Sequence, residues 1–518
     1  MSPYRSAKPA RQDISSGNLL NRRQVLGLGA AILIAPVLRP DHAHAVPRPV
    51  GKIKPEDLTR ATPPGFPWKR FHLDIAEGAV MSGGGKLISI NGKKSGPEIR
   101  LKQGEVFYVT VRNRLREATT VHWHGIIVPN LMDGVPHVSQ VPIPSGIETT
   151  YAWPVIQSGT FWYHSHMGLQ EQQGLAGPLI LESSDNDGLN YDREAVLFME
   201  DRLSANPNQV LDALQGKTAP AAAKAAIAAP SAPIFPYPDG KMFGVDVQYT
   251  RFPLNGNLPN SPTIIDAMPD EVLRLRILNA SASSYFLFKV DDHNLEVVAK
   301  DGNRTRPLAT QNILIATAER YDALIKVGKP GVYRITGAAV GQTTGALALL
   351  RVGNSPLPVK IDAPLPGNTR FEGKTIDAND IRSQYSTVLP DANVETIREV
   401  LAGNMKSYRW SINGEYYPDA KPEIIASGRR VRLEVVNDTM MYHPMHLHGH
   451  FFRVEREDMP EDEYAPLMDT YSVPPKSKVT LAFYSDNPGR WVFHCHNMYH
   501  MAAGMLRVIS YNATDISG

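Results

Sequence analysis

An alternation of hydrophobic and polar residues that closes on an asparagine occurs three times along the chain. The runs occupy residues 104–113, 270–279 and 428–437, and in each the apolar side chains recur at every second position. Because successive side chains of a β-strand point to opposite faces, this period predicts one half-buried strand per run. The runs are spaced 166 and 158 residues apart, which indicates three copies of one structural unit.

A second element follows each run at a similar distance. Its copies begin at Gly159, Gly331 and Gly489 and lie 172 and 158 residues apart. Short strands at this density favour antiparallel sandwiches or barrels over parallel βαβ units. We therefore expect three homologous β-domains, with the ranges 46–185, 186–355 and 356–518.

The composition agrees with an all-β protein of several domains. With 518 residues the chain is too long for one hydrophobic core, and 40 Gly with 42 Pro indicate many turns and few long helices. The Ala/Pro-rich stretch Pro220–Pro238 is typical of an unstructured surface insertion, although a mobile flap is the alternative. The segment Leu357–Asp391 is typical of an interdomain connection.

The first 45 residues have the features of an export signal. Arg22 and Arg23 precede an apolar run, Val25–Leu38, that ends at the Ala43-His44-Ala45 cleavage pattern. The run is too short to span a bilayer comfortably, and twin arginines are the signature of the Tat translocase. We expect a signal peptide over residues 1–45, no stable membrane insertion and a periplasmic or secreted protein. An uncleaved anchor is the alternative, which Met1 on the exported protein would reveal.

The charge gives no support for nucleic-acid binding, and the cysteine content rules out an intrachain disulfide. The formal net charge is +2, and the body of the chain has no basic stripe, so nothing favours nucleic-acid binding. Although an exported protein can form disulfides, the single Cys495 has no intrachain partner. Stability must therefore come from packing and bound metal.

Ten of the sixteen histidines fall in four short clusters. In a strand, a His-x-His sequence places two imidazoles on the same face, where they can share a metal. In the last cluster the same geometry directs Cys495 to the opposite face, so adjacent residues join two metal sites. The clusters are His122-Trp-His124-Gly, His164-Ser-His166, His443-Pro-Met-His446-Leu-His448-Gly and His494-Cys495-His496 followed by His500.

The residues that follow Cys495 in the sequence, together with His443, include the ligand set of a blue-copper site. His500 and Met505 follow it at intervals of five residues, and His443 completes a His₂Cys set with Met505 as a weak axial ligand. Eight histidines then remain, four from the first domain and four from the third. The second domain has Thr336 where the others carry histidine, so we expect it to be a spacer without metal ligands.

With HxHG, HxH, HPxHxHG and HCHxxxHxxxxM in order, the sequence resembles the multicopper oxidase family over essentially the whole mature chain. The resemblance implies three cupredoxin-like Greek-key β-barrel domains and four copper ions. It makes His443, Cys495, His500 and Met505 the type 1 ligands and assigns His122 and His446 to type 2 copper. For the type 3 pair it implies His124, His164 and His496 on one ion and His166, His448 and His494 on the other.

The resemblance also implies an activity, the oxidation of a donor one electron at a time at type 1 copper and the four-electron reduction of dioxygen to water at the other three ions. Cys495 would pass the electrons on. Asp133 lies where the family has its proton-relay acid, although an Asp-Gly turn residue is the simpler interpretation. Met501 occupies the position of a second acid found in some members.

The sequence leaves two classes of electron donor possible, cuprous ions and phenols or aromatic amines. The resemblance is closest to the exported bacterial branch linked to copper tolerance, and Met440 and Met441 would offer soft sulfur to a Cu(I) substrate. Methionines also fill hydrophobic gaps, and Thr439 stands where cuprous oxidases have an acid, so a laccase acting on phenols and aromatic amines is the competing prediction. A copper-sequestering protein without turnover is the alternative from another class, and oxygen uptake would distinguish it.

Overall fold

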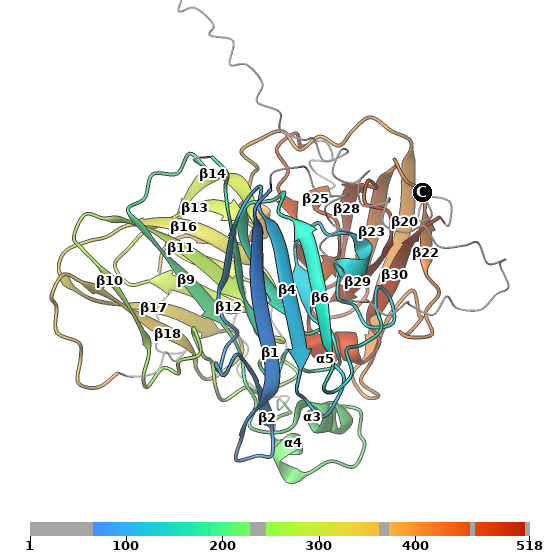
Figure 1. Ribbon diagram of the computed structural model, residues 1–518, viewed down its shortest axis with the longest axis horizontal. Helices are drawn as coiled ribbons and strands as arrows, with labels where there is room; N and C mark the ends of the chain where they lie inside the picture. The colour runs from blue at the N-terminus through green and yellow to red at the C-terminus, as the bar shows by residue number, and fades with distance from the viewer. Residues whose placement is uncertain (1–65, 186, 228–244, 362–371, 456–461, 513–518) are drawn as a thin grey trace, which may run out of the picture.

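Sheet makes up nearly all regular structure in the computed structural model, which describes residues 66–185, 187–227, 245–361, 372–455 and 462–512. The all-β prediction is confirmed. Six sheets form three pairs, one pair for each repeat (Figure 1). The predicted signal peptide lies outside the described residues, and within them no helix has the length and apolar character needed to cross a bilayer.

The first unit consists of two four-stranded sheets. One has the order β2-β1-β4-β6 and the other β3-β8-β7-β5. The strands are β1 Trp68–Val80, β2 Lys86–Ile90, β3 Ile99–Lys102, β4 Val106–Asn113, β5 His122–His124, β6 Glu148–Pro154, β7 Gly159–His164 and β8 Ala176–Glu182.

The second unit has sheets of six and five strands, in the orders β10-β18-β17-β12-β15-β19 and β14-β13-β16-β11-β9. The short β19 lies in the predicted interdomain connection and pairs with β15. The strands are β9 Arg193–Met199, β10 Thr263–Ala267, β11 Val272–Asn279, β12 Phe286–Val290, β13 Leu295–Lys300, β14 Asn303–Thr310, β15 Asn312–Ile315, β16 Arg320–Lys326, β17 Gly331–Ala339, β18 Gly345–Val352 and β19 Thr375–Ile376.

The third unit repeats the arrangement with the orders β21-β20-β23-β28-β25-β26 and β22-β30-β29-β24-β27. The strands are β20 Val394–Asn404, β21 Arg409–Ile412, β22 Glu423–Ile425, β23 Arg430–Asn437, β24 His443–Leu447, β25 Phe452–Glu455, β26 Leu467–Met468, β27 Thr470–Val473, β28 Ser477–Tyr484, β29 Arg490–Cys495 and β30 Leu506–Tyr511.

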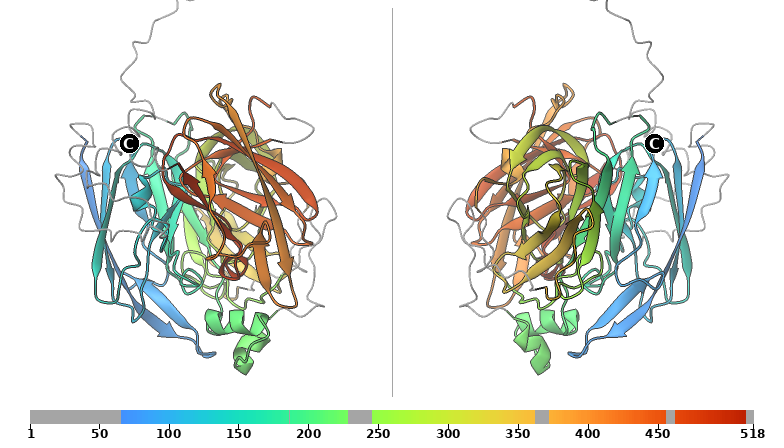
Figure 2. Two further views of the ribbon diagram at one scale, coloured as in Figure 1. Left: turned by 90° about the vertical axis from the view of Figure 1, so that its right-hand side faces the viewer. Right: turned by 90° about the vertical axis from the view of Figure 1, so that its left-hand side faces the viewer.

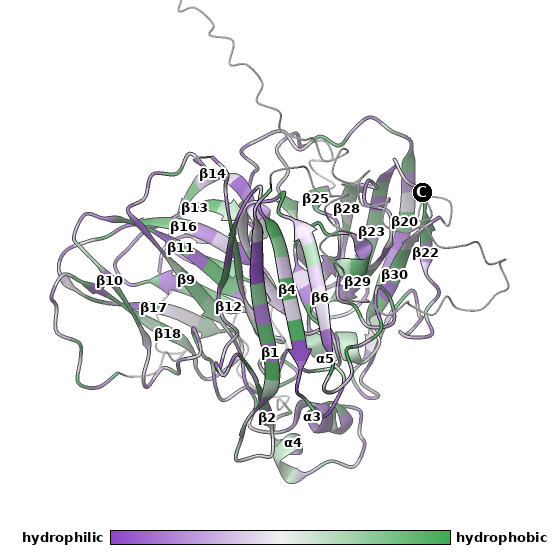
Figure 3. Cartoon of the chain, viewed as in Figure 1, coloured by the Kyte–Doolittle hydropathy of each residue, from purple (hydrophilic) through white to green (hydrophobic). Residues whose placement is uncertain are grey.

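The three predicted runs form equivalent strands. β4, β11 and β23 each have one parallel neighbour and one antiparallel neighbour, so the sheets are mixed rather than purely antiparallel. The predicted alternation of buried and more exposed residues is clear in β23 and nearly so in β4. The ribbon of β4 changes between hydrophobic and hydrophilic colours along its length (Figure 3). In β11 the half-buried prediction is wrong, because Arg274 and Arg276 on its polar face are buried. Arg276 donates to Thr160 of the first unit, and Arg274 pairs with Asp322 of β16.

Short helices complete the described chain. α3 (Pro207–Leu214) packs against α4 (Ala221–Ala225), and α5 (Met498–Ala502) follows β29. The part of the predicted insertion that the structure describes is thus helical at α4 rather than unstructured, and Ala223 is buried there. Two turns of 3-10 helix lie at Asn130–Met132 and Ala378–Asp380.

The first and third units lie side by side and the second contacts both (Figures 1 and 2). Thr160 of the first unit accepts a hydrogen bond from Arg276 of the second, and Tyr285 of the second bonds Ser472 of the third. The histidine-bearing strands β5 and β7 of the first unit, and β24 and β29 of the third, therefore meet at one boundary.

Candidate metal centres

Three side chains of the third unit converge on one point. The Nδ1 atoms of His443 and His500 lie 3.1 Å apart, and the Cys495 sulfur lies 3.6 and 3.7 Å from them. His443 begins β24, Cys495 ends the adjacent β29, and His500 follows on α5. All three are completely buried. We call this group the thiolate site.

Hydrogen bonds on the far side of each ring direct Nδ1 inward. The His443 Nε2 lies 2.8 Å from the Thr439 hydroxyl, and the His500 Nε2 lies 2.7 Å from the Asp246 carboxylate. Asp246 comes from the second unit and also accepts the hydroxyl of Tyr408 at 2.7 Å. These contacts orient the two rings, and the Asp246 carboxylate, which can only accept when ionised, favours a proton on Nε2 of His500.

Met505 immediately precedes β30, the strand that pairs with β29 on the side away from β24. It is fully buried, and its carbonyl accepts the backbone N–H of Cys495 at 3.1 Å. Burial raises the pKa of the Cys495 thiol, whereas a metal ligand must be the thiolate. A cation bound at the sulfur would therefore be needed to favour the thiolate in this buried position.

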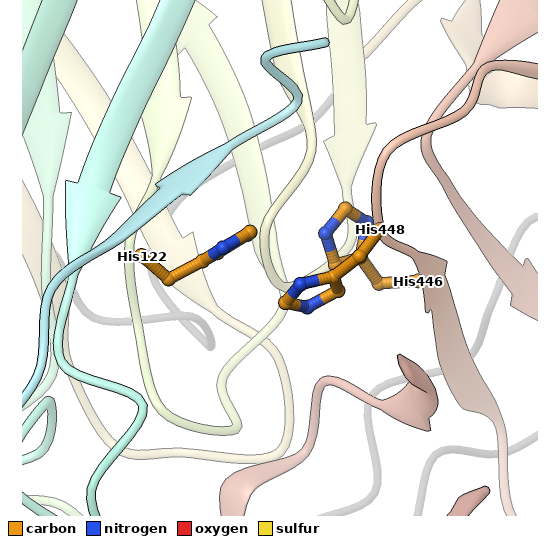
Figure 4. A group of neighbouring side chains, drawn as sticks. All are labelled: His122, His446 and His448. Carbon is orange, nitrogen blue, oxygen red and sulfur yellow. The ribbon is translucent and has the colours of Figure 1, made fainter. Parts of the chain in front are cut away.

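The other eight clustered histidines face one another across the boundary between the first and third units. His122 lies opposite His164 in the β5–β7 pair, and His446 lies opposite His494 in the β24–β29 pair. Figure 4 shows His122 approaching His446 and His448 from the opposite side. The His122 ring stacks on His448 with centroids 3.8 Å apart. We call this group the eight-histidine cluster.

Within the cluster two sets of three rings lie close together. Centroids of His124, His164 and His496 are 5.1 to 5.6 Å apart. Those of His166, His448 and His494 are 5.0 to 5.2 Å apart. These are the two triplets that the resemblance assigns to the type 3 pair, and the remaining His122 and His446 lie 5.8 Å apart. The closest ring pairs cross this division, since His122 stacks on His448 and His124 on His446 with centroids 3.8 Å apart, so the division into triplets rests on the resemblance.

Unpartnered nitrogen atoms test whether the cluster fits metal ions. Buried imidazole nitrogens normally have hydrogen-bond partners. Among the described residues several here have none, and they belong to rings that face the cluster: Nε2 of His122, His164 and His446, Nδ1 of His124 and both nitrogens of His496. Burial lowers the pKa of His494 to about 3 and places the pKa values of its neighbours well below the ordinary range. Neutral imidazoles with free nitrogens fit copper ligands.

Buried acids hold the outer nitrogens of the cluster. The Asp133 carboxylate lies 2.9 Å from Nδ1 of His448, and its carbonyl lies 2.7 Å from Nδ1 of His122. Glu171 lies 2.7 Å from Nδ1 of His164. Asp469 instead lies 3.0 Å from Nε2 of His124. His124 is therefore held with Nδ1 toward the cluster, whereas His122, His164 and His448 present Nε2.

Both interpretations of Asp133 describe its structure. It ends the 3-10 turn at residues 130–132 and precedes Gly134, whose φ of +80° and close approach to Val121 exclude a larger side chain. Its carboxylate is nonetheless fully buried against the cluster, and burial raises its pKa above the ordinary value. The turn thus places the carboxylate within hydrogen-bonding distance of His448 in the cluster.

The two methionines predicted to bind a cuprous substrate differ in exposure. Met440 is 72% exposed, whereas Met441 is half-buried. Asp438, the nearest acid in sequence, pairs with Lys476 at 2.7 Å, which lowers its pKa. Thr439 bonds His443 instead. The structure thus brings together the predicted histidine and cysteine ligands. Met505 is buried next to them in the fold, but its sulfur forms no hydrogen bond with them among the described residues, and Met440 lies at the surface.

Sequence reasoning missed Asp246, Asp469 and Glu171. Each is a lone acid outside the histidine motifs, and only the fold brings it to a ligand. The expected spacer thus supplies no predicted ligand in its described residues, but its Asp246 bonds the predicted ligand His500.

Comparisons with known proteins agree with this geometry. Family models described as multicopper oxidase match residues 76–186, 215–355 and 390–515. The multicopper oxidase MmcO of Mycobacterium tuberculosis is 33% identical, covering 80% of this chain and 81% of that protein. Copper resistance protein A of Escherichia coli is 29% identical, covering 85% and 92%.

Solved structures share the fold. Fet3p, a multicopper oxidase that functions in iron import, aligns with a TM-score of 0.69 and 21% identity over 87% of this chain and 92% of its own. The laccase from Botrytis aclada aligns with a TM-score of 0.70 and 23% identity over 88% and 90%. The prediction of cupredoxin-like barrels is confirmed.

Proposed function

Because this chain belongs to the multicopper oxidase family, we propose that the thiolate site and the eight-histidine cluster together hold four copper ions. His443, Cys495, His500 and Met505 would bind type 1 copper, and His122 and His446 type 2 copper. The two close triplets would bind the type 3 pair. The protein is a copper-dependent oxidoreductase that uses dioxygen, and its relatives favour an oxidase over a copper store.

The observation that carries the proposal is the position of Cys495 on β29. Its side chain enters the thiolate site, while His494 and His496 on either side enter the cluster. When bound, copper supplies one-electron chemistry that carries electrons from a donor to dioxygen. The backbone of one strand then joins the two centres over adjacent residues. Asp133 would hold and deliver the protons that water formation requires.

We propose that the donor docks beside His443 and His500. Asp246 would orient the ring of His500 through its Nε2 atom, and Tyr408 would in turn hold the Asp246 carboxylate. The relatives named copper resistance proteins favour Cu(I), and the exposed Met440 with its neighbour Met441 would supply soft ligands for it. The relatives named laccases favour phenols. Asp438, the acid nearest to these methionines in sequence, forms an ion pair with Lys476 and so is not free to bind a cuprous ion.

Oxygen uptake by the copper-loaded protein tests the proposal. We expect uptake with Cu(I), with a phenol, or with both, and four coppers per chain by metal analysis. Met440→Leu/Met441→Leu should lower turnover with Cu(I) and leave turnover with the phenol unchanged if these sulfurs dock the metal. Met268→Leu, which alters another exposed methionine, is the matched control. Absence of uptake with either donor would contradict the oxidase.

We propose a periplasmic or secreted location reached through the Tat translocase, with the mature domains at residues 46–185, 186–355 and 356–518. The twin arginines and the cleavage pattern support export. Cell fractionation of the chain with Arg22 and Arg23 replaced by lysine tests it. Retention in the cytoplasm is expected, whereas unchanged export would contradict a Tat route.

A further inference from the structure

Arg320 is a fully buried arginine on β16 of the second unit, and it contacts both other units. Its Nε donates to the carbonyl of Thr160 in β7 at 3.2 Å, the strand that also carries His164. Its two terminal nitrogens donate to the two carboxylate oxygens of Asp469, at 2.7 and 2.5 Å. A planar guanidinium matches a carboxylate in this two-point geometry, which a lysine cannot reproduce.

Asp469, which precedes β27, holds one histidine from each metal-binding unit. Its carboxylate lies 3.0 Å from Nε2 of His124, and its carbonyl lies 2.7 Å from Nδ1 of His446. These two rings stack with centroids 3.8 Å apart and planes 14° apart. The carboxylate is 1% exposed, and the pairing with Arg320 offsets the cost of burying its charge.

Gly125 shows how closely this pair is packed. It follows His124 with a φ of +80°, and a Cβ there would lie 2.5 Å from Oδ2 of Asp469 and 2.6 Å from Nη2 of Arg320. The glycine of the HxHG motif therefore leaves room for the ion pair. The same arrangement explains why His124 presents Nδ1 to the cluster.

We propose that Arg320 is a positioning residue for the eight-histidine cluster, acting through Asp469 to fix the ring and tautomer of His124 and its stacking on His446. The unit without copper ligands thereby aligns the ligands of the other two. This inference rests on the proposed copper roles of His124 and His446. The cost of losing such a support is about 10- to 100-fold in metal affinity or activity.

Three variants of the full-length, copper-loaded protein test the inference, namely Arg320→Lys, Asp469→Asn and the double variant. The readouts are the electron paramagnetic resonance signal of type 2 copper, copper bound per chain, and oxygen uptake. We expect Arg320→Lys to alter the type 2 signal and to lower uptake about 10- to 100-fold, with the blue colour unchanged. If Arg320 acts through Asp469, the double variant should be no worse than Asp469→Asn alone.

Arg274→Lys is the matched control. Arg274 is also a buried arginine of the second unit, and it pairs with Asp322 through Nε at 3.1 Å and Nη2 at 2.6 Å. Neither residue contacts a histidine of the cluster in the hydrogen bonds of the described chain. We expect this variant to lower stability and to leave the type 2 signal as in the wild type.

Two results would overturn the inference: a wild-type type 2 signal and turnover in Arg320→Lys, or an equal change of the signal in Arg274→Lys. If Arg320→Lys does not fold, Gly125→Ala displaces the pair with both charges in place and is judged by the same readouts. Failure of the proposed function is distinct, because the unaltered protein would then bind no type 2 copper.

Discussion

The thiolate site and the eight-histidine cluster differ in how many units of the chain build them. All four proposed ligands of the thiolate site come from the third unit, within β24, β29 and the residues up to Met505. The cluster takes four histidines from the first unit and four from the third. The thiolate site is thus a local product of one fold, whereas the cluster exists only when two folds dock.

Their supports differ in the same way. Thr439 lies four residues from His443, although Asp246 reaches His500 across the boundary of the second unit. Around the cluster, Asp133 of the first unit bonds His448 of the third, and Asp469 of the third bonds His124 of the first. Perturbations at unit boundaries should therefore affect the cluster more than the thiolate site.

The largest effect is expected for Cys495→Ser, which separates the two centres. A serine hydroxyl is a poor ligand for copper that prefers soft sulfur, so the blue colour and essentially all turnover should be lost. The cluster should keep its copper, because its ligands are untouched. Metal analysis with oxygen uptake checks both parts, and turnover near that of the wild type would disprove the link through Cys495.

A smaller loss is expected for Asp133→Asn, which removes the acid and keeps its shape. We expect oxygen reduction to slow by about 10²- to 10⁴-fold, the usual range for a positioned proton donor, with the blue colour retained. Asp266→Asn, which alters an exposed acid of the second unit that pairs with Arg351, serves as the control. Turnover equal to the wild type would contradict a proton-delivering role.

The same variant predicts a change in pH dependence. Burial raises the pKa of Asp133, so its protonated form persists to higher pH than that of an exposed aspartate. Wild-type turnover should fall as the pH rises through this pKa, because the donor is lost. A pH profile of Asp133→Asn should lack that fall, whereas an unchanged profile would assign it to another group.

Asp246→Asn tests how local the thiolate site is. A carboxylate at the outer nitrogen increases the electron donation of a ligating imidazole, so its loss should raise the reduction potential of type 1 copper and alter turnover by about 10- to 100-fold. A redox titration of the blue colour measures the shift. An unchanged potential would show that the third unit alone determines the site.

How far the sequence predicts this molecule follows from the same contrast. The proposed copper ligands stand in short motifs, so spacing and the family resemblance predicted the histidines and Cys495 as a set. The alternation predicted β4 and β23 because one face of each is more accessible than the other. It failed for β11, where Arg274 and Arg276 are polar and yet buried, since their partners Asp322 and Thr160 are distant in sequence and cannot be read from a local period.

The supporting acids could not be predicted for a related reason. Asp469 lies 345 residues from His124, and Asp246 lies 254 residues from His500. Neither belongs to a motif, and a lone aspartate is ordinarily a surface residue. Only the docking of whole units defines these partners.

The smallest effect on either centre is expected from a change inside the third unit and away from its histidines. Glu399 on β20 is buried beside Arg507, with Glu415 and Glu423 nearby, and burial raises its pKa to about 8. Because the folded pKa exceeds the unfolded one, the protonated acid favours folding most at low pH, and this contribution is lost as the pH rises through about 8.

Glu399→Gln should therefore raise the Tm above that pH relative to the wild type and change it little near pH 5. Thermal unfolding at both pH values, with the blue colour and the type 2 signal recorded, separates stability from metal geometry. A shift of either signal would show that the thiolate site and the cluster respond to packing throughout the third unit, and not only to the residues that touch their ligands.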